Sequence, residues 1–588
     1  MLVPLELDEN TVVIHDAQRR RWLLFRRPEA LHVARTHDEV IPALRAVENR
    51  VSRDGLCAAG FLAYEAAPAF DSALAVKPSP RFPLLWFGLY REPEDLPSQS
   101  LALSQRCSDV VWTPSISEAE YGRAIAGIKE YIQAGDTYQV NYTLRLRTRF
   151  SDEPWPFFAQ LIRAQRCGYG AFVNTEDCLI CCASPELFFR LDGNELVSRP
   201  MKGTIARGLW YEQDRENAAR LHGSEKDRAE NVMIVDMVRN DMGRVAGTGS
   251  VEVTGLFDVE RYPTLWQMTS TVRCTTGAGI TDVFRALFPP ASITGAPKAR
   301  TMQIIREIED SPRTIYTGAI GCITSPRTAQ FNVAIRTVVI DKRTRAAEYG
   351  TGGGIVWDST SESEFKECAT KARILTCSRP EFSLLETLLW TPEDGYFLLE
   401  RHLLRLSNSA EYFDYSVDID AIQETLIASA AGLPARPHKV RLIVPEEGPP
   451  ILDIQPIAQR RQVSRVCLAK RPVDSSDPFL YHKTTLRRTY EQALEACPGY
   501  DDVLLWNERG EITESCIANI VVEISGEYFT PPVHCGLLPG VYRSLLLEQG
   551  KVKERVIRVD ELPVCTEISL INSVSMQWMA ILDRPDSH

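Results

Sequence analysis

The feature that most constrains this chain is a break in its helical pattern near residue 380. Residues 361–375 fit a helix, and Cys-Ser-Arg-Pro-Glu-Phe then follows over 377–382. Pro380 cannot continue a helix and keeps the residue before it extended. A strand pattern over 383–390 and a Pro-Glu-Asp-Gly turn come next. We therefore expect a large first part and a second part of about 205 residues, each of domain size.

The composition is that of a soluble globular protein with more than one domain. The 588 residues exceed what one core of about 250–300 residues can organise. Hydrophobic residues make up 44% and charged residues 24%, with a net charge of −12. We expect no nucleic-acid partner, because such proteins usually carry a basic patch. No apolar run approaches the roughly 18–20 residues of a membrane span, so we expect no membrane insertion.

The terminal residues and the cysteines favour a cytoplasmic location. Residues Met1–Asn10 carry three acidic side chains and no basic one, which differs from a secretory signal. The fifteen cysteines are scattered and odd in number, as expected for reduced thiols. The group Cys178, Cys181 and Cys182 lies in an apolar, strand-like run without a second pair, so we expect structural thiols rather than a metal site.

Capping signals and apolar spacing predict three helices in the first part, over 117–135, 224–240 and 361–375. Each begins at a serine that is followed three residues later by an acidic residue, and the first helix shows one apolar face. Alternating residues over 140–146 and β-branched residues over 331–340 predict strands. Mixed helices and strands indicate an α+β or α/β architecture.

Acidic side chains share a face on two of these helices. Asp227 and Glu230 are three residues apart, and Glu364, Glu367 and Lys371 also lie on one face. The ordinary interpretation is a solvated surface with an ion pair between Glu367 and Lys371. The alternative is a Mg²⁺ site with one carboxylate from each helix, which would leave room for an anionic substrate. Spacing alone leaves both interpretations open.

One loop of the first part could bind an anion through its backbone, and a second has an unusual sequence. The run Glu348–Gly354 is rich in glycine, which lets N–H groups approach a ligand closely, although a tight turn explains it equally well. Arg336 could clamp a carboxylate, or lie on an edge strand without a role. Ser292–Lys298 forms a loop into a helix, with Pro297 in its first turn.

Together these stretches resemble the chorismate-utilising synthases, which make anthranilate, aminodeoxychorismate, isochorismate or salicylate. The similarity runs from Ser117 to Leu375 and implies an α+β fold, a β-sandwich with surrounding helices. It rests on five motifs in order: Ala-Gly-Asp-Thr-Tyr-Gln-Val-Asn (134–141), Ser-Pro-Glu-Leu-Phe (184–188), Asp-Arg-Ala-Glu-Asn-Val-Met-Ile-Val-Asp-Met-Val-Arg-Asn-Asp (227–241), Ile-Thr-Gly-Ala-Pro-Lys (293–298) and Gly-Thr-Gly-Gly-Gly-Ile-Val (350–356).

Within this family, Lys202 in Pro-Met-Lys-Gly-Thr (200–204) indicates the position that is aminated. Anthranilate synthases resemble the segment but have alanine there, whereas aminodeoxychorismate synthases carry lysine. The resemblance implies that Lys202 adds at C2 of chorismate and directs ammonia to C4. Glu186 matches the general acid/base. Gln267 stands where relatives that eliminate pyruvate carry histidine, and this difference fits an enzyme that stops before that step.

The resemblance also implies a metal and a substrate site. Glu230 and Glu367 would hold Mg²⁺, with Asp227 and Glu364 acting through water. The expected chorismate-binding residues are Arg336, Thr294, Gly295, Tyr349, Gly352, Gly353, Gly354 and Lys371.

The second part has its own candidate lysine, Lys483, in Tyr-His-Lys-Thr-Thr (481–485). A solvated loop lysine is the ordinary interpretation. With Glu511–Ile520 and Leu538–Arg543, however, this segment resembles the fold-type IV pyridoxal-phosphate enzymes, which implies an α/β domain. Lys483 matches the lysine that binds the cofactor covalently, and Glu514 the carboxylate that faces its pyridine nitrogen. The phosphate-binding residues implied are Arg405, Gly540, Val541 and Tyr542.

We therefore expect three segments. Residues 1–110, which end in a polar stretch at Leu96–Pro114, resemble the N-terminal region of the synthases. Residues 111–378 would form the chorismate-binding catalytic domain. Residues 379–588 would form the pyridoxal-phosphate domain, which resembles aminodeoxychorismate lyase as well as aminotransferases.

The combination implies p-aminobenzoate synthesis for folate, in which a synthase makes aminodeoxychorismate from chorismate and ammonia and a lyase removes pyruvate. The cofactors would be Mg²⁺ and pyridoxal 5'-phosphate. A separate glutamine amidotransferase would supply ammonia, and the lyase part favours a homodimer. One alternative is an anthranilate synthase fused to an aminotransferase, against which Lys202 and Gln267 argue. Another is a regulatory protein that binds chorismate-like ligands without turnover, against which the retained catalytic residues argue.

Overall fold

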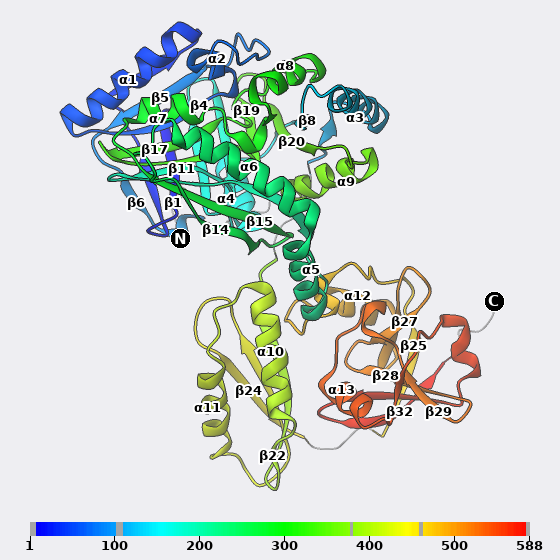
Figure 1. The fold of residues 1–588 in the computed structure, drawn as a ribbon. Coiled ribbons are helices and arrows are strands. Elements are labelled where there is room, and N and C mark those ends of the chain that lie inside the picture. The colour runs from blue at the N-terminus through cyan, green and yellow to red at the C-terminus, as the bar shows by residue number, and fades with distance from the viewer. Residues whose placement is uncertain (1–6, 102–109, 377–379, 458–461, 584–588) are drawn as a thin grey trace. The chain divides into compact units, whose positions relative to one another are not determined.

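The computed structural model describes residues 7–101, 110–376, 380–457 and 462–583. The chain forms two compact units (Figure 1). Unit 1 consists of Met1–Ala206 and Ala218–Arg379, and unit 2 of Arg207–Asn217 and Pro380–His588. Residues 377–379 of the predicted break, and residues 102–109 within the weaker predicted boundary, lie outside the described residues.

Unit 1 contains two ten-stranded antiparallel sheets within the described residues. Strands from the first hundred residues lie in the same sheets as those that follow them. The first sheet contains, in spatial order, β16 (Gly295–Ala296), β8 (Gln139–Arg149), β20 (Ala346–Ile355), β19 (Thr337–Asp341), β10 (Cys178–Ser184), β9 (Tyr169–Asn174), β1 (Thr11–Asp16), β2 (Arg21–Phe25) and β6 (Glu94–Leu96), with β7 (Thr113–Pro114) beside β8.

The second sheet begins with the strand that carries Lys202. Its strands, in spatial order, are β13 (Met201–Ala206), β15 (Leu265–Thr275), β12 (Glu195–Arg199), β11 (Leu187–Asp192), β18 (Thr328–Val333), β17 (Ala319–Ser325), β4 (Cys57–Leu62), β5 (Leu85–Tyr90) and β3 (Ala30–Ala34), with β14 (Glu252–Arg261) beside β15.

An apolar core between the two sheets makes unit 1 a β-sandwich. Ile14 and Ile180 from the first sheet belong to the same buried cluster as Phe61 and Trp86 from the second. Since β10 is buried on both faces, all seven of its residues are apolar or small. Cys181 and Cys182 lie in separate apolar clusters on its two faces, as expected for structural thiols.

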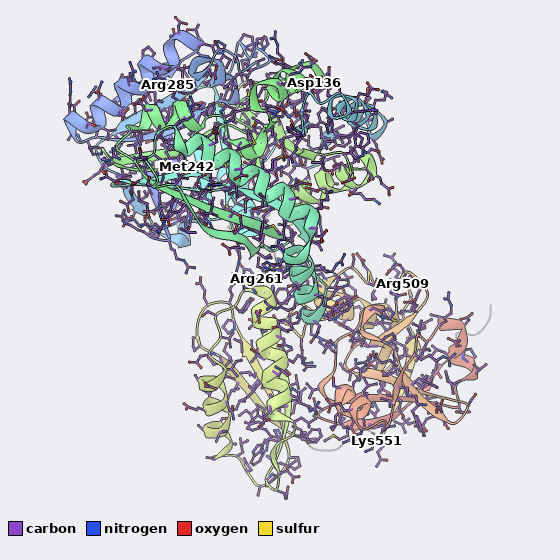
Figure 2. All side chains as sticks on the ribbon, viewed as in Figure 1. Asp136, Met242, Arg261, Arg285, Arg509 and Lys551 are labelled. Carbon is purple, nitrogen blue, oxygen red and sulfur yellow. The ribbon has the colours of Figure 1, made fainter. Side chains whose placement is uncertain are left out.

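Helices cover the outer faces of the sandwich, which confirms the predicted α+β class (Figure 1). On α7 (Ile280–Leu287), Phe284 packs into the core, whereas Arg285 points outward and pairs with Asp282 (Figure 2). The other α-helices whose residues fall wholly in unit 1 are α1 (His37–Asp54), α2 (Ala67–Phe70), α3 (Glu118–Gln133), α4 (Pro154–Gln165), α6 (Glu225–Gly243), α8 (Lys298–Ile308) and α9 (Ser361–Ala372).

The capping signals are right for two of the three predicted helices. Ser117 caps α3 through a capping box with Glu120, and Ser224 caps α6 through the Asp227 amide. Helix α9 differs, because its cap is Thr360, whose side chain accepts from the Ser363 amide. The predicted capping box at Ser361 is therefore wrong, and Ser361 is the first helical residue.

The β-branched stretch over 331–340 is two strands rather than one. It is divided between β18 in the second sheet and β19 in the first. Arg336, between them, has a left-handed backbone with φ of 52°, which turns the chain from one sheet to the other. The predicted strands over 140–146 and 383–390 are confirmed as β8 and β21 (Leu384–Thr391).

Unit 2 contains a four-stranded and an eight-stranded sheet within the described residues. The smaller sheet has the order β22 (Gly395–Tyr396), β21, β23 (His438–Val444) and β24 (Ile451–Pro456). The larger sheet has the order β27 (Ile512–Ser515), β26 (Asp502–Trp506), β25 (Val463–Leu468), β32 (Met576–Leu582), β31 (Glu567–Asn572), β28 (Asn519–Ile524), β29 (Glu527–Thr530) and β30 (Lys553–Glu554).

The smaller sheet packs against α10 (Leu399–Phe413) and α11 (Ile419–Ala430) through one apolar cluster. The larger sheet mixes parallel and antiparallel pairs, with β25 parallel to both neighbours. Helix α12 (Arg488–Ala496) contacts β26 of this sheet, and α13 (Val541–Glu548) contacts β31. Helix α5 (Tyr211–Gly223) begins in residues that belong to unit 2. Within the described residues, no helix combines the length and apolar character needed to cross a membrane.

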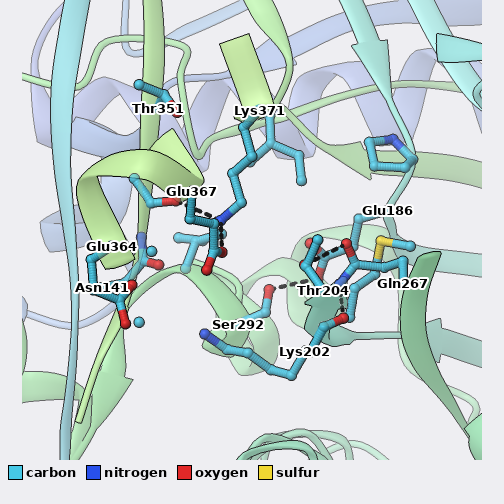
Figure 3. A pocket seen from close by; sticks show the side chains of 18 of the residues that line it. Asn141, Glu186, Lys202, Thr204, Gln267, Ser292, Thr351, Glu364, Glu367 and Lys371 are labelled. Atoms are coloured by element: carbon cyan, nitrogen blue, oxygen red, sulfur yellow. Dashed lines mark hydrogen bonds and ion pairs between the residues drawn. The ribbon is translucent and has the colours of Figure 1, made fainter. Parts of the chain in front are cut away.

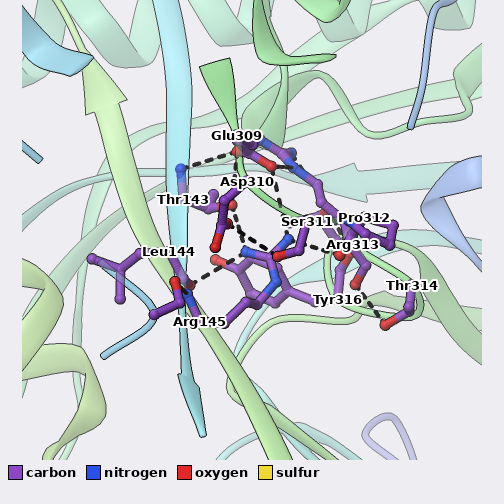
Figure 4. Close-up of polar contacts among 12 residues, drawn as sticks. Thr143, Leu144, Arg145, Glu309, Asp310, Ser311, Pro312, Arg313, Thr314 and Tyr316 are labelled. Atoms are coloured by element: carbon purple, nitrogen blue, oxygen red, sulfur yellow. Dashed lines mark hydrogen bonds and ion pairs between the residues drawn. The ribbon is translucent and has the colours of Figure 1, made fainter. Parts of the chain in front are cut away.

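A buried ion network joins three elements of unit 1 (Figure 4). Arg313 donates to both carboxylate oxygens of Glu309, at 2.6 and 3.0 Å, and to the carbonyls of Ile293 and Asn141 at 2.8 and 2.7 Å. Arg145 lies 3.7 Å from the same carboxylate, and both arginine side chains are 1% exposed. The buried Glu309 carboxylate thus faces two arginines, and Arg145 also lies 3.5 Å from the carboxylate of Glu348.

We expect Glu309→Leu to destabilise unit 1 by about 3–5 kcal/mol, because it leaves the buried Arg313 guanidinium without its ion-pair partner and leaves Arg145 with only the partly exposed Glu348. The measurement is the urea midpoint of the unit 1 transition. The control is Glu362→Ala, which breaks an exposed pair with Lys366 and should change stability by less than about 0.5 kcal/mol. An unchanged midpoint for Glu309→Leu would contradict the account.

Candidate active sites

Unit 1 encloses a polar cavity of about 300 Å³, lined by residues from both sheets and from α6 and α9 (Figure 3). It brings together most of the site residues expected from the sequence. Those that line it are Glu186, Lys202, Asp227, Glu230, Arg336, Tyr349, Gly352, Gly353, Gly354, Glu364, Glu367 and Lys371.

Lys202 reaches this cavity from β13, where glycine leaves it room. A Cβ atom at Gly354 would lie 2.6 Å from Lys202 Nζ and 2.1 Å from Gln139 Nε2. Burial lowers the pKa of Lys202, and the Lys371 ammonium adds to this effect against the opposing charge of Glu230. A lowered pKa increases the neutral, nucleophilic fraction of a lysine amine.

Glu186 stands between β10 and β11, with 3% of the residue exposed. Burial raises the pKa of Glu186 to about 7, although the Ser292 hydroxyl and the Lys202 charge favour the ionised form. Ser292 Oγ donates to Glu186 Oε1 at 2.6 Å (Figure 3). A carboxyl group with this pKa can both donate and accept a proton near neutral pH.

Four carboxylates from two helices face the same cavity. Burial, followed by the charges of Asp227 and Glu364, raises the pKa of Glu230 against the opposing Lys202 and Lys226. Burial and the Glu367 charge raise the pKa of Glu364. Burial also opposes ionisation of Glu367, but Lys371, 2.6 Å away, outweighs it and lowers that pKa.

The carboxylates are close but do not form a closed cation site. Within the described residues, no group of three or more histidine, cysteine, aspartate or glutamate side chains is arranged to hold a metal ion. A Cβ atom at Gly353 would lie 3.0 Å from Glu364 Oε2 and 3.9 Å from Lys371 Nζ. The absence of a side chain at Gly353 of β20 therefore leaves space for the acidic side chains of α9.

Three cationic side chains also line this cavity. Arg336 is 5% exposed and donates to Gln165 Oε1 at 3.0 Å, which fixes its guanidinium. Lys371 Nζ donates to the Gly352 carbonyl at 2.8 Å. Lys226 also lines the cavity and was not expected from the sequence. These charges suit a substrate with more than one carboxylate.

Thr294 and Gly295 shape the loop behind the cavity rather than lining it. Thr294 Oγ1 donates to the carbonyls of Pro290 and Ala291 at 3.4 and 3.2 Å. Gly295 lies in β16 and pairs with Val140 of β8. The neighbouring Ser292 and Ile293 line the cavity instead. Ser292 stands in the loop noted in the sequence, but nothing in its spacing points to Glu186.

Gln267 holds the backbone beside Lys202. Its Nε2 donates to the Gly203 carbonyl at 2.9 Å, and its Oε1 accepts from Thr204 Oγ1 at 3.1 Å. A side-chain amide can make both bonds without changing its charge with pH. Gln267 thus fixes the part of β13 that directly follows Lys202, where the strand has a register irregularity.

Unit 2 contains a second cavity, of about 510 Å³. All the cofactor-binding residues expected from the sequence line it: Arg405, Lys483, Glu514, Gly540, Val541 and Tyr542. Lys439, Arg441 and Arg487 also line it and were not expected.

Burial shifts the pKa values of both Lys483 and Glu514 in this cavity. Burial and the nearby Arg405 lower the pKa of Lys483 to about 8, while Glu386 opposes the shift. Burial raises the pKa of Glu514 to about 7. Glu514 accepts from Tyr490 Oη at 2.8 Å and from Asn519 Nδ2 at 3.1 Å, so its position is fixed.

Arg405 is held by a buried acid. Its Nε and Nη2 donate to the two carboxylate oxygens of Glu386 at 2.9 and 2.7 Å, and its Nη1 to the Pro539 carbonyl at 3.3 Å. Burial opposes ionisation of Glu386, but Arg405 and His402 lower its pKa to about 2. Pro539 precedes Gly540, the N-cap of α13, so Arg405 lies beside that helix start.

Comparison with known families agrees with this division. Residues 9–376 match the family of chorismate binding enzymes, and residues 383–581 match the amino-transferase class IV family. The chain therefore belongs to the chorismate binding enzyme family, and its second part is a class IV amino-transferase domain.

The chain is similar to aminodeoxychorismate synthase component 1 of Salmonella typhimurium, with 41% identity over 268 residues, 45% of this chain and 58% of the relative. It is also similar to anthranilate synthase component 1 of Aquifex aeolicus, with 37% identity over 266 residues, 45% of this chain and 53% of the relative. The chain thus spans somewhat more than half the length of these curated relatives.

The fold of unit 1 has a counterpart among solved structures. Anthranilate synthase component I from Streptococcus pneumoniae TIGR4 aligns with a TM-score of 0.53 at 22% identity, covering 64% of this chain and 94% of that one. The likeness at this identity shows a shared fold.

We expect Ser292→Ala to slow chorismate consumption about tenfold and to raise the pKa of Glu186 above about 7 by about one unit. The lost hydrogen bond stabilises the ionised form, so the rate profile should move to higher pH. The measurement is the rate with ammonium and Mg²⁺ against pH. Ser361→Ala, at the partly exposed start of α9, is the control. A profile that keeps its midpoint in Ser292→Ala would contradict this role.

Proposed function

We propose that the chain makes p-aminobenzoate, a precursor of folate, from chorismate and ammonia in two steps. Unit 1 aminates chorismate at C4 and releases water, which gives 4-amino-4-deoxychorismate. Unit 2 removes pyruvate from that product, and the ring becomes aromatic. The observation that carries the proposal is the buried Lys202 in one cavity with Glu186, since a lysine at this position is what aminodeoxychorismate synthases carry and anthranilate synthases lack.

The residues of unit 1 support the following order of events. The Lys202 amine adds at C2, and the C4 hydroxyl leaves as water with the proton of Glu186. Ammonia then bonds to C4 and the Lys202 amine is released from C2, which restores the free lysine. Glu186, ionised after the first stage, accepts the proton that ammonia loses. Gln267 does not titrate and performs no elimination, so pyruvate stays attached.

The acidic helices would supply two carboxylates to Mg²⁺, an ion that keeps several waters and needs no closed set of protein ligands. The raised pKa values of Glu230 and Glu364 come from burial and from neighbouring carboxylates, an arrangement that a divalent cation would relieve. Glu230 and Glu367 would hold the ion, with Asp227 and Glu364 acting through water. When bound, Mg²⁺ supplies positive charge for the ring carboxylate of chorismate. Arg336 and Lys371 hold the remaining anionic groups.

The second cavity fits pyridoxal 5'-phosphate. Lys483 would hold it covalently, and a protonated pyridine nitrogen would face Glu514 and return that group to its ionised form. Arg405 and the backbone of Gly540–Tyr542 would hold the phosphate. When bound, the cofactor supplies an electron sink. Once the substrate amine has displaced it, the free Lys483 amine, whose pKa burial lowers to about 8, would take the proton from C4 of the substrate.

Ammonia would come from a separate glutamine amidotransferase. The name component 1 of the bacterial relatives supports such a partner. We also propose a homodimer formed through unit 2, on the basis of the resemblance to fold-type IV enzymes. The reduced cysteines support a cytoplasmic location.

We expect Lys202→Ala to reduce aminodeoxychorismate formation by about 10²–10⁴-fold, because the group that directs ammonia to C4 is lost. The measurement is product formation from chorismate, ammonium and Mg²⁺ by chromatography. Lys366→Ala, on the exposed face of α9, is the matched control and should retain the wild-type rate. Wild-type amination at C4 by Lys202→Ala would refute the assignment.

We expect Lys483→Ala to stop the second step alone. Aminodeoxychorismate should accumulate at the wild-type rate, p-aminobenzoate should fall by about 10²-fold or more, and the visible absorption of lysine-bound pyridoxal phosphate should disappear. Lys551→Ala, an exposed lysine of unit 2, is the control (Figure 2). Continued p-aminobenzoate formation by Lys483→Ala would show that another residue carries the step.

A further inference from the structure

Eleven residues that interrupt unit 1 in the sequence belong to unit 2 in the structure. Residues Arg207–Asn217, called the strap here, lie within the chorismate binding enzyme match over 9–376. They begin directly after β13, the strand of Lys202. The proposed function gives this segment no role.

The strap is closed internally by a buried ion pair. Arg207 Nε and Nη2 each donate to a carboxylate oxygen of Asp214 at 2.7 Å, and the two side chains are 7% and 3% exposed. The amide of Gly208 donates to the same carboxylate at 2.8 Å. A Cβ atom at Gly208 would lie 2.2 Å from the Asp214 amide nitrogen, so this close approach requires glycine. The strap is therefore a defined structure.

The strap packs against two other parts of unit 2. Arg207 Nη2 donates to the Tyr412 carbonyl at 2.8 Å, and its guanidinium lies 4.4 Å from the centre of the Tyr412 ring. Tyr412 Oη donates in return to the Gly208 carbonyl at 2.7 Å. Trp210 stacks on Tyr481 with ring centres 5.4 Å apart. Leu209 and Trp210 also pack against the apolar cluster that contains Tyr481.

These contacts surround the residue that precedes Lys483. The His482 ring lies 4.1 Å from the Tyr412 ring and 4.8 Å from the Phe413 ring, and its Nδ1 is 3.0 Å from Ser409 Oγ. The next residue, Lys483, accepts the Leu385 amide through its carbonyl at 2.9 Å. Three consecutive residues thus have three different environments. Tyr481 contacts the strap, His482 is buried among aromatic rings, and Lys483 lines the second cavity.

The charge on the strap acts on His482 as well. Burial, and then the Arg207 charge, lowers the pKa of His482 to about 3, so its ring is neutral at neutral pH. The groups that face it are Arg207 and the backbone of Leu209, which opposes the shift, from the strap, and Ser409, Tyr412 and Phe413 from α10. No second cation therefore forms beside Lys483 under ordinary conditions.

We propose that the strap is a positioning element of the second site, which holds Tyr481–Lys483 so that the Lys483 amine stays directed into its cavity. Eleven residues from within the chorismate-binding part of the sequence would then be needed for the pyridoxal-phosphate site. The claim about cofactor binding rests on the proposed function, whereas the claim about the Tyr481–Lys483 segment does not.

The test uses the full chain with two strap variants. Trp210→Ala removes the stacking on Tyr481. Arg207→Lys keeps the positive charge but loses the bidentate ion pair with Asp214. Glu216→Ala changes an exposed strap residue and is the matched control. Three quantities are measured: amide hydrogen exchange of peptides over 478–487, the dissociation constant of pyridoxal phosphate, and the rate of aminodeoxychorismate formation.

We expect both strap variants to exchange these amides about tenfold faster or more, and to bind pyridoxal phosphate about tenfold more weakly or more. Aminodeoxychorismate formation should stay within about twofold of wild type, which separates the effect from general unfolding. If Trp210→Ala also reduces the rate of aminodeoxychorismate formation, that variant is generally unfolded, and the exchange and cofactor affinity of Arg207→Lys then test the proposal.

Wild-type exchange and cofactor affinity in Arg207→Lys would overturn the proposal. If the wild-type chain itself binds no pyridoxal phosphate, the proposed function of unit 2 fails, and the exchange of residues 478–487 still decides on the strap. Faster exchange there would support the positioning role, and unchanged exchange would overturn it.

Discussion

Removal of charged groups from water is the constraint on which both sites depend. In unit 1, Lys202, Glu186 and the acidic residues of α6 and α9 share a cavity that forms only because β20 carries glycine at Gly353 and Gly354. Side chains at these positions would occupy the space of Lys202 Nζ and Glu364. Burial then raises the pKa of Glu186 to about 7 and lowers the pKa of Lys202, which favours the neutral form of both groups.

Unit 2 applies the same constraint with a different set of partners. Burial shifts the pKa of Lys483 to about 8 and that of Glu514 to about 7, while Arg405 and His402 lower the pKa of the buried Glu386 to about 2. A cavity with several arginines and lysines and with Glu514 opposite suits a cofactor that has a phosphate at one end and a basic nitrogen at the other. In both units, burial therefore shifts the pKa values of a lysine and a carboxyl group that share one cavity.

Local patterns in the sequence predicted the elements that local forces decide. The serine caps of α3 and α6, the strands β8 and β21 and the shared faces of the acidic helices follow from spacing and capping. The cap of α9 was misjudged by one residue, since Thr360 and Ser361 both suit the position. The split of 331–340 at Arg336 could not be predicted, because it depends on two sheets that meet there. The Ser292–Glu186 bond and the membership of residues 207–217 in unit 2 likewise join residues far apart in the chain.

The central claim is that Lys202 directs ammonia to C4 and that unit 2 completes the conversion. Its most direct test is the identity of the product after the purified chain is incubated with chorismate, Mg²⁺, an ammonium salt and pyridoxal phosphate. The account predicts p-aminobenzoate together with an equal amount of pyruvate. Anthranilate as the product would contradict it, because amination would then occur at C2 despite Lys202, and unit 2 would need a different substrate.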